Sequence, residues 1–360
     1  MSDTGRSKTA PRVPRERTLR DCSASFTREQ IQNIATERVS TGLPELDRIL
    51  NGGLANGLYV LGAVPGLGKS TLALQIAYNV SGQGVPVLYF ALEMSRNWIT
   101  AKALCRADFM GSGQGSFQAS DLLDARASRH FSDETWERID RAREQIQREG
   151  AHLYLYEQGP DLNHIEHIEA CIGAFRSAHQ EYGQDFPLMV VVDYLQILAP
   201  REAALRSSDK QIIDDIVREL CRIRDQQQVI ILLISALNRV SYNRPITLES
   251  FKESGSIEYS ADVILGMQYH GIDRKGFSLE EAKNRRPREL DLTLLKMRYG
   301  RDGLSIPLRF YSESSYFQQP EGSGQSQRTR CQELREQFLS SCPLIHYHDG
   351  LHREAREIER

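Results

Sequence analysis

The chain has 360 residues, of which 26% are charged and 40% are hydrophobic. Its 45 Lys and Arg residues against 48 Asp and Glu residues give a formal net charge of −3. These values are typical of soluble globular proteins, and no apolar run approaches the roughly 20 residues that a membrane-spanning helix needs. A near-neutral charge argues against a protein coated in nucleic acid, but it allows a local basic loop that binds a phosphate backbone.

The N-terminus lacks the apolar region of a secretory signal, and the six cysteines are scattered without a CxxC pair. We therefore expect a reducing, cytoplasmic environment, no disulfide framework and no membrane contact. A zinc site drawn from Cys331, Cys342 and the nearby histidines matches no common ligand spacing, so we expect no structural metal there.

Both ends of the chain are predicted to lie outside the main domain. Residues 1–26 are polar and basic, which predicts a disordered arm that is either solvated or in contact with nucleic acid. Residues 27–38 are predicted to be a short linker helix. Residues 317–330 are rich in Gln, Gly and Ser and predict a second linker, followed by a short helical tail over 331–360.

Between these ends, residues 39–316 are predicted to form one domain in which strands and helices alternate. The predicted strands span 58–61, 85–92, 188–192, 229–235, 263–268, 292–297 and 304–310. The predicted helices span 71–80, 134–147 and 210–224. This order predicts an α/β fold with a doubly wound, mainly parallel sheet and a C-terminal antiparallel hairpin. Such a sheet binds ligands at the carboxyl ends of its strands.

A phosphate-binding loop follows the first predicted strand and precedes an amphipathic helix. Its residues are Ala63, Val64, Pro65, Gly66, Leu67, Gly68, Lys69 and Ser70, with Thr71 next. The two glycines let backbone N–H groups face phosphate oxygens. Lys69 would then bind the outer phosphates, and the Ser70 hydroxyl would be a ligand of Mg²⁺.

Two carboxylates end predicted strands at the same edge of the sheet. Asp193 follows residues 188–192, where a carboxylate can hold the water shell of Mg²⁺. Glu93 follows the second strand, where it can orient or deprotonate the water that attacks the γ-phosphate. Taken alone, Glu93 also fits a charge at a helix N-terminus.

Over residues 39–312 the chain resembles the ATPase domain of DnaB-type replicative helicases, a RecA-like branch of the P-loop proteins. The resemblance rests on an ordered series of short motifs. They are residues 40–47, the phosphate loop, Leu92-Glu93-Met94-Ser95, Asp193-Tyr194-Leu195-Gln196, Leu237-Asn238-Arg239, residues 252–258, Ala261-Asp262 and residues 296–300.

The resemblance implies a RecA-like fold and a ring, usually a hexamer, with ATP and Mg²⁺ between subunits and single-stranded DNA in the channel. Lys69 and Ser70 match the phosphate-loop pair, Asp193 the Mg²⁺ carboxylate and Glu93 the catalytic base. Lys296 and Arg298 match the pair that reaches the γ-phosphate of the neighbouring subunit. Without the family, these two residues would be interpreted as solvated positions on a strand.

The resemblance also implies DNA contacts through Lys252, Glu253 and Gly255. A second predicted loop, with Arg201 and Arg206, lines the channel or is simply solvated. A separate primase or loader is a possible partner, because fewer than forty residues precede Ser40, whereas replicative members carry a helical domain there.

Two functions remain open. One is an ATP-dependent, DNA-translocating helicase acting in DNA replication. The other is a RecA-like ATPase that uses ATP as an assembly switch without unwinding. Ala236 stands where the family usually has a Gln that can sense the γ-phosphate, and this favours the switch. The joint presence of Glu93, Asp193, Lys296 and Arg298 favours the helicase.

Overall fold

The structure is a computed structural model, and it describes residues 18–30, 38–157, 163–182, 186–199, 208–238, 241–251 and 254–320. The chain divides into two compact units, Met1–Arg38 and Val39–Arg360. The predicted tail over 331–360 lies outside the described residues, as does the zinc site considered there.

In the first unit, α1 spans Leu19–Ser25, within the stretch that was predicted to be a disordered arm. Local hydrogen bonds explain the turn of helix. The Cys22 N–H donates to the Thr18 carbonyl at 3.0 Å, and the Ser23 hydroxyl donates to the Arg20 carbonyl at 2.8 Å. Of the predicted linker helix over 27–38, residues 28–30 are helical, and residues 31–37 lie outside the described residues.

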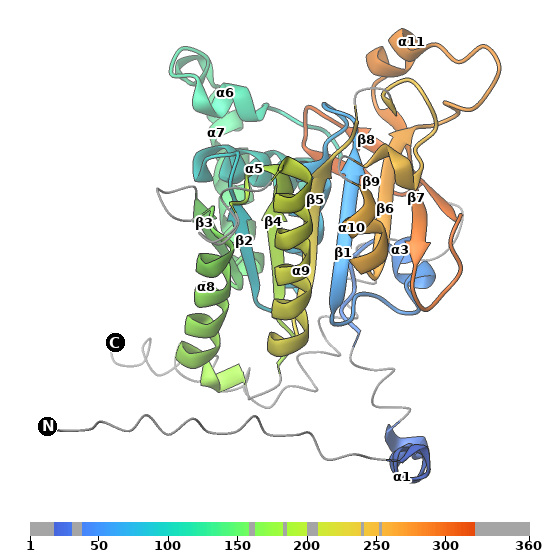
Figure 1. The fold of residues 1–360 in the computed structure, drawn as a ribbon. Helices are drawn as coiled ribbons and strands as arrows, with labels where there is room; N and C mark the ends of the chain where they lie inside the picture. The colour runs from blue at the N-terminus through green and yellow to red at the C-terminus, as the bar shows by residue number, and fades with distance from the viewer. Residues whose placement is uncertain are drawn as a thin grey trace, which may run out of the picture. The chain divides into compact units, whose positions relative to one another are not determined.

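The second unit is built on one sheet, in which nine described strands follow the order β3-β2-β4-β5-β1-β6-β7-β8-β9 (Figure 1). The strands span Gly57–Ala63 (β1), Val87–Ala91 (β2), Leu153–Glu157 (β3), Met189–Asp193 (β4), Ile230–Ala236 (β5), Val263–Tyr269 (β6), Arg288–Met297 (β7), Ser305–Tyr311 (β8) and Tyr316–Gln318 (β9). Strands β1 to β6 pair in parallel, and β7, β8 and β9 add antiparallel pairings. The predicted α/β class, with a mainly parallel sheet and antiparallel C-terminal strands, is confirmed.

Helices lie on both sides of this sheet. They span Pro44–Ile49 (α3), Lys69–Ser81 (α4), Arg96–Ser112 (α5), Ala119–Leu123 (α6), Asp133–Glu149 (α7), Ile165–Ala178 (α8), Asp209–Gln227 (α9), Ser254–Ser260 (α10) and Leu279–Asn284 (α11). Short 3₁₀ turns span Ser128–His130, Gln180–Tyr182, Leu195–Ile197 and Leu248–Ser250. Serine caps begin three of the longer helices, since Ser95, Ser132 and Ser208 each accept a backbone N–H from the first turn.

Two hydrophobic clusters cover the two faces of the sheet. One packs α3 and α4 against one face, and the other packs α8, α9 and α10 against the opposite face (Figure 1). Within β1, Tyr59 and Leu61 belong to the first cluster, whereas Leu58 and Val60 belong to the second. A strand buried on both faces is a continuous apolar run, which is why the central strands were predictable.

The edges of the sheet differ from the prediction. Strand β3 lies between the predicted strands 85–92 and 188–192, where only a helix over 134–147 was predicted, and its five residues are half-buried at the sheet edge. Strand β9 lies partly in the predicted linker over 317–330. It forms because Gln75 of α4 holds the backbone of Phe317 with two hydrogen bonds of 2.8 Å, one to its carbonyl and one from its N–H.

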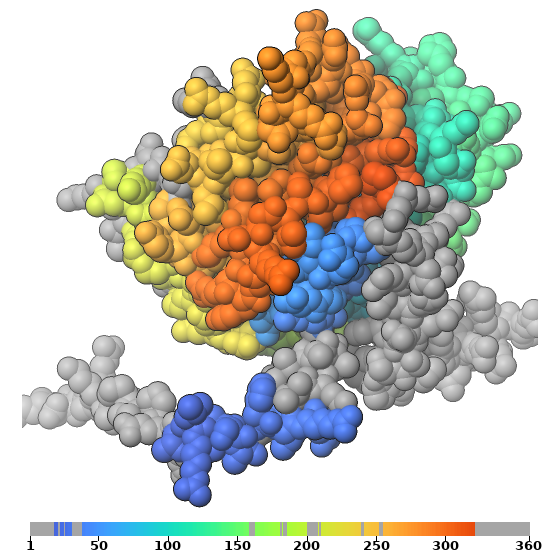
Figure 2. Space-filling model, turned by 90° about the vertical axis from the view of Figure 1, so that its right-hand side faces the viewer, coloured from blue at the N-terminus to red at the C-terminus, as the bar shows by residue number. Residues whose placement is uncertain are grey.

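The antiparallel end forms one face of the unit. Figure 2 shows β7, β8 and β9, in orange to red, side by side on this face, with the α11 segment next to them. The blue segment that follows residue 39 lies beside them, and the Glu45 N–H donates to Gln319 Oε1 at 3.2 Å. This end of the sheet carries both Lys296 and Arg298.

Candidate functional site

The phosphate loop connects the end of β1 to the start of α4, as the sequence predicted. Gly66 has φ 82° and Gly68 has φ 89°, in the left-handed region that favours glycine. Gly68 is also closely packed, because an added Cβ would lie 2.8 Å from Phe310 Cζ. Both glycines are thus required by the shape of the turn, and the first N–H groups of α4 that follow it are donors suited to an anion.

Asp193 is held at the carboxyl end of β4, next to the first turn of α4. Its side chain accepts a hydrogen bond from Ser70 Oγ to Oδ1 at 3.1 Å, and one from Tyr89 Oη to Oδ2 at 2.9 Å. Only 1% of Asp193 is exposed, and this burial raises the pKa of its carboxyl group despite both hydrogen bonds. A buried carboxylate beside a hydroxyl supplies the hard oxygen ligands that suit Mg²⁺.

Lys69 reaches back over the loop. Its ammonium donates to the Ala63 carbonyl at 3.2 Å. Burial lowers the pKa of Lys69, and the charges of Asp193 and Glu93 partly oppose this shift. Glu93 itself is exposed just beyond β2. The structure thus brings Lys69, Ser70 and Asp193 into one site, with Glu93 at its open side.

Two further side chains of the site were missed from the sequence. Tyr89 is fully buried in β2 and orients Asp193. Lys102 of α5 donates to the Thr71 hydroxyl at 3.1 Å, and burial lowers its pKa while the charge of Asp193 opposes the shift. A lysine inside a helix and a tyrosine inside an apolar strand carry no local signal of such contacts.

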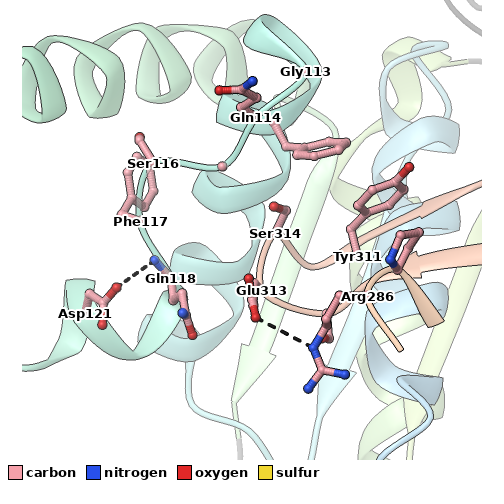
Figure 3. A pocket seen from close by; sticks show the side chains of 14 residues that line it. Gly113, Gln114, Ser116, Phe117, Gln118, Asp121, Arg286, Tyr311, Glu313 and Ser314 are labelled. Carbon is pink, nitrogen blue, oxygen red and sulfur yellow. Dashed lines mark hydrogen bonds and ion pairs between the residues drawn. The ribbon is translucent and has the colours of Figure 1, made fainter. Parts of the chain in front are cut away.

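A pocket of about 520 Å³ lies between the segment that follows α5 and the β8–β9 turn (Figure 3). Its walls come from residues 113–118 on one side, and from Arg286, Pro287 and the β8–β9 turn on the other. Tyr311 lines it with its ring 4.7 Å from the Phe109 ring, and Arg286 Nε lies 3.7 Å from Glu313 Oε1. The next residue after Pro287, Arg288, donates from Nη1 to the Gly66 carbonyl at 3.0 Å, which ties this wall to the loop.

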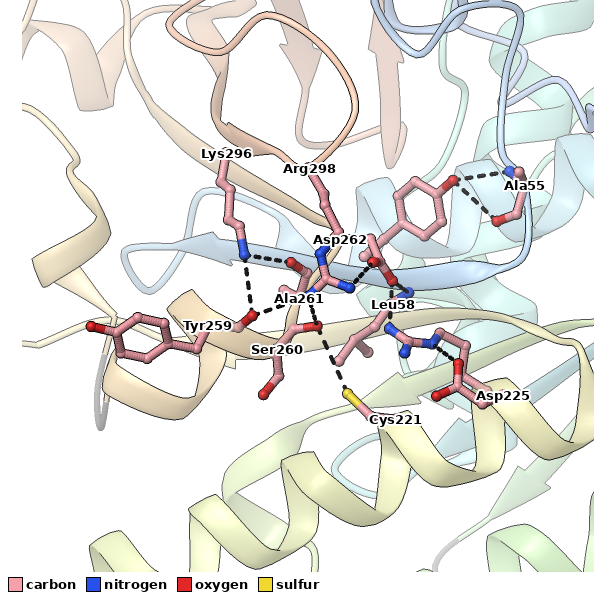
Figure 4. A network of polar contacts seen from close by, with 12 residues as sticks. Ala55, Leu58, Cys221, Asp225, Tyr259, Ser260, Ala261, Asp262, Lys296 and Arg298 are labelled. Atoms are coloured by element: carbon pink, nitrogen blue, oxygen red, sulfur yellow. Dashed lines mark hydrogen bonds and ion pairs between the residues drawn. The ribbon is translucent and has the colours of Figure 1, made fainter. Parts of the chain in front are cut away.

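Lys296 and Arg298 lie at the end of β7 and point towards α10 (Figure 4). The Lys296 ammonium donates to the Ala261 carbonyl at 2.7 Å and to the Glu258 carbonyl. Arg298 forms an ion pair with Asp262, with 3.0 Å between Nη1 and Oδ1. Lys296 is half-buried and Arg298 is exposed, and both make contacts that a strand pattern alone does not indicate.

The predicted DNA-contacting residues are only partly described. Gly255 is the second residue of α10, whereas Lys252, Glu253, Arg201 and Arg206 lie outside the described residues. Beside Ala236, Gln196 Oε1 accepts the Ala236 N–H at 3.1 Å, and Gln196 Nε2 donates to Ser235 Oγ at 3.2 Å. The side-chain amide that the family usually has at the position of Ala236 is absent from β5, and the side-chain amide beside Ala236 belongs to Gln196, which follows β4.

In the part of the chain that the structure describes, no three His, Cys, Asp or Glu side chains are grouped as they would be around a metal ion. Nor does any helix in these ranges have the length and apolar character needed to cross a membrane.

Solved structures with this fold include an ATPase domain solved on its own and a DnaB-like replicative helicase. The first has a TM-score of 0.67 at 24% identity and covers 83% of this chain and 98% of the other. The second has a TM-score of 0.66 at 23% identity, covers 82% of this chain and 67% of the other, and was solved in a study of its interactions with primase.

Similar curated proteins include replicative helicases of bacteria. The replicative DNA helicase DnaC of Bacillus subtilis is 28% identical over 286 residues, which cover 78% of this chain and 56% of the relative. The replicative DNA helicase DnaB of Leifsonia xyli is 30% identical over 266 residues, which cover 73% of this chain and 52% of the relative. This chain therefore spans about half the length of these relatives. A family model, the DnaB-like helicase C terminal domain, matches residues 38–319, and the chain belongs to this family.

Proposed function

We propose that this chain is an ATP-dependent DNA translocase and helicase of DnaB type. It would hydrolyse ATP at the interfaces of a ring, usually a hexamer, and couple hydrolysis to movement on single-stranded DNA during replication. The observation that carries the proposal is the hydrogen bond from Ser70 to Asp193 at the end of the phosphate loop. In the same loop, the Lys69 ammonium donates to the Ala63 carbonyl.

Each residue of this site has a defined task. Lys69 and the N–H groups of the loop bind the outer phosphates. Ser70 and Asp193 would hold Mg²⁺, which when bound neutralises charge on the β- and γ-phosphates. Glu93 orients the attacking water and accepts its proton. Tyr89 keeps the Asp193 carboxylate directed at Ser70.

The site needs a second subunit to be complete. Lys296 of β7 and Arg298, which directly follows β7, both contact α10, whereas Arg288 of β7 contacts the phosphate loop. We therefore place Lys296 and Arg298 at the nucleotide of a neighbouring subunit, where the added positive charge stabilises the transition state. Hydrolysis then depends on assembly.

The pocket of Figure 3 is proposed to bind the nucleotide base. It is wide enough for a purine, and Tyr311 supplies an aromatic face while backbone and side-chain amides of residues 114–118 supply polar partners. Arg288, which directly follows the lining residues Arg286 and Pro287, donates to the Gly66 carbonyl, and this contact connects one wall of the pocket to the phosphate loop.

Single-stranded DNA is proposed to bind Lys252, Glu253 and Gly255, with Arg201 and Arg206 as a second contact. Backbone N–H groups and ammonium groups hold phosphates without reading the bases. A separate primase or loader is a proposed partner. This fits the replicative relatives, although half of their length has no counterpart in the matched region.

The assembly switch is the second candidate, and Ala236 favours it. Its methyl group cannot sense a phosphate, and Gln196 is already engaged with the backbone of Ala236 and with Ser235. A site of this kind can bind and hydrolyse ATP but couple it poorly to DNA movement.

ATPase rates with and without single-stranded DNA, measured beside strand displacement on a forked duplex, separate the two candidates. The helicase predicts DNA-stimulated ATPase together with displacement, both lost in Lys69→Ala. DNA-stimulated ATPase without displacement contradicts the helicase and supports the switch. Light scattering with and without nucleotide reports whether a ring forms.

A further inference from the structure

The end of β7 meets the C-terminal turn of α10. Besides the Lys296 contacts, Arg298 Nη2 donates to the carbonyls of Tyr259 at 3.1 Å and Ser260 at 3.4 Å. The last carbonyls of a helix lack partners within the helix and carry partial negative charge. Two cations therefore complete the C-terminus of α10, and α10 in turn restrains both side chains.

A bulge directs both side chains to this helix. Strands β6 and β7 pair Ile264 with Lys296 but Leu265 with Leu294, so Leu295 is an extra residue in β7. Leu292 and Leu294 face the α4 side of the sheet, whereas Leu295 packs on the α9–α10 side. An extra residue reverses the alternation of a strand, and it turns Lys296 and Arg298 to the α10 side.

Asp262 joins this end of β7 to the rest of the domain (Figure 4). Its Oδ2 accepts the Leu58 N–H at 2.8 Å and the Arg224 Nη1 donor at 2.6 Å, while Oδ1 pairs with Arg298. The Arg298 N–H also donates to the Asp262 carbonyl at 2.8 Å. Arg298 is thus fixed at its backbone and at its guanidinium by the same residue.

We propose that Asp262 is a positioning residue for Arg298 in the ATPase reaction. The Arg298 side chain is 35% exposed and that of Asp262 is 18% exposed, so the guanidinium lies at the surface on a half-buried anchor. A long exposed arginine samples many rotamers, and ordering it before the neighbouring nucleotide arrives lowers the entropic cost of closing the site. This inference rests on the proposed function, since it assigns Arg298 to the nucleotide of the next subunit.

The test compares Asp262→Asn with Arg224→Gln, which removes the other charged partner of Asp262 and leaves Arg298 untouched. In DNA-stimulated ATPase assays on the assembled full chain, we expect Asp262→Asn to lower kcat about 10- to 100-fold with KM changed less than about threefold, because small displacements of a catalytic group have effects of this size. Arg224→Gln should keep kcat within about threefold.

A double-variant cycle identifies the residue through which Asp262 acts. If Asp262 acts through Arg298, adding Asp262→Asn to Arg298→Ala lowers kcat no further, because the contact is already gone. Equal losses in both backgrounds, or a loss in Arg224→Gln as large as in Asp262→Asn, overturn the inference in favour of a structural role. If Asp262→Asn does not fold, Asp262→Glu is used instead because it keeps the charge. The same double-variant cycle with Arg298→Ala then shows whether Asp262 acts through Arg298.

Failure of the proposed function gives a different result. If Arg298→Ala itself leaves DNA-stimulated kcat unchanged, the assignment of Arg298 to the neighbouring nucleotide is wrong, and the role of Asp262 falls with it. If Arg298→Ala lowers kcat and Asp262→Asn does not, the proposed function stands and only the role of Asp262 is rejected.

Discussion

Ser70 Oγ donates a hydrogen bond to Asp193 Oδ1 across 3.1 Å, although 123 positions separate the two residues in the chain. Strands β1 and β4 both pair in parallel with β5, which explains the contact because the two strands end at the same edge of the sheet. The hydroxyl and the carboxylate thus lie together as the proposed pair of Mg²⁺ ligands, and each can be tested separately.

Replacing Asp193 by Asn should lower the ATPase kcat by about 10²- to 10³-fold, since the loss removes charge at a site where charge develops. Asn keeps the size of the side chain and an oxygen that can accept from Ser70. The measurement is the ATPase rate over a titration of Mg²⁺. Tyr89→Phe is the comparison, because it removes only the hydrogen bond to Oδ2, and we expect a loss below about tenfold. Equal losses in the two variants would argue that the Asp193 charge has no special role.

Asp193→Asn should also stabilise the folded protein when nucleotide and Mg²⁺ are absent. Burial raises the pKa of Asp193 above its ordinary value of 3.8, so the folded state binds this proton more tightly than the unfolded state. Stability therefore falls as pH rises from 3.8 through the pKa of the folded state, and the full loss is present at neutral pH.

Thermal unfolding between about pH 4 and pH 8 tests this expectation. We expect Asp193→Asn to have the higher Tm near neutral pH and the difference to shrink as the pH falls towards the ordinary pKa of an aspartate. A lower Tm for Asp193→Asn at every pH would show instead that its hydrogen bonds outweigh the buried charge.

The phosphate loop and Asp193 could be predicted because their signals are local. A Gly-rich turn that ends in Lys and Ser between an apolar strand and a helix is specific to phosphate binding, and Asp193 directly ends a buried strand. The central strands were predictable for the same reason, since burial on both faces leaves continuous apolar runs. Strand β3 was missed although its sequence, LYLYE, carries a short run of residues that favour strands.

The contacts of Arg298 could not be predicted in the same way. They depend on a bulge and on Asp262, which lies in a different part of the chain. A trace of the bulge does exist in the sequence. Leu290, Leu292 and Leu294 alternate with polar residues, and Leu295 then breaks the alternation before Lys296. This break in the pattern indicates that the side chains after Leu295 change to the other face of the sheet. It does not indicate which helix packs on that face.

If sites are shared between subunits, two inactive variants should restore activity when mixed. Lys69→Ala lacks a working phosphate loop but keeps Arg298, and Arg298→Ala has the reverse defect. In a mixed ring, the loop of one variant can meet the Arg298 of the other. We expect each variant alone to lose about 10³-fold in ATPase rate, and the mixture to recover a substantial fraction of it.

The mixing experiment needs a control for lost positive charge. Arg301→Ala removes an exposed arginine from the same β7–β8 turn and should stay close to wild-type activity. If the mixture is no more active than the two variants added together, Arg298 does not act across an interface.

Tyr311→Ala should raise the KM for ATP about tenfold and change kcat little, because base stacking contributes binding that is equal in ground and transition states. Tyr311→Phe keeps the aromatic face and should keep the KM within about twofold. Steady-state kinetics with ATP, and direct binding of a fluorescent nucleotide, provide the measurement. A normal KM in Tyr311→Ala would place the base outside the pocket of Figure 3.

Lys252→Ala should weaken binding of single-stranded DNA and reduce the salt dependence of that binding by about one phosphate contact. The reason is that a lysine that neutralises a phosphate releases a counterion on binding, whereas a solvated lysine does not. Fluorescence anisotropy of a labelled oligonucleotide across a salt series measures how steeply the binding constant falls with salt concentration. The same measurement on Arg201→Ala and Arg206→Ala tests whether the second loop contacts DNA. Lys275→Ala, which removes an exposed cation from the turn between β6 and α11, is the matched control and should leave the slope unchanged. An unchanged slope in Lys252→Ala together with a reduced slope in Arg201→Ala or Arg206→Ala would move the DNA contact from the loop before α10 to the loop before α9.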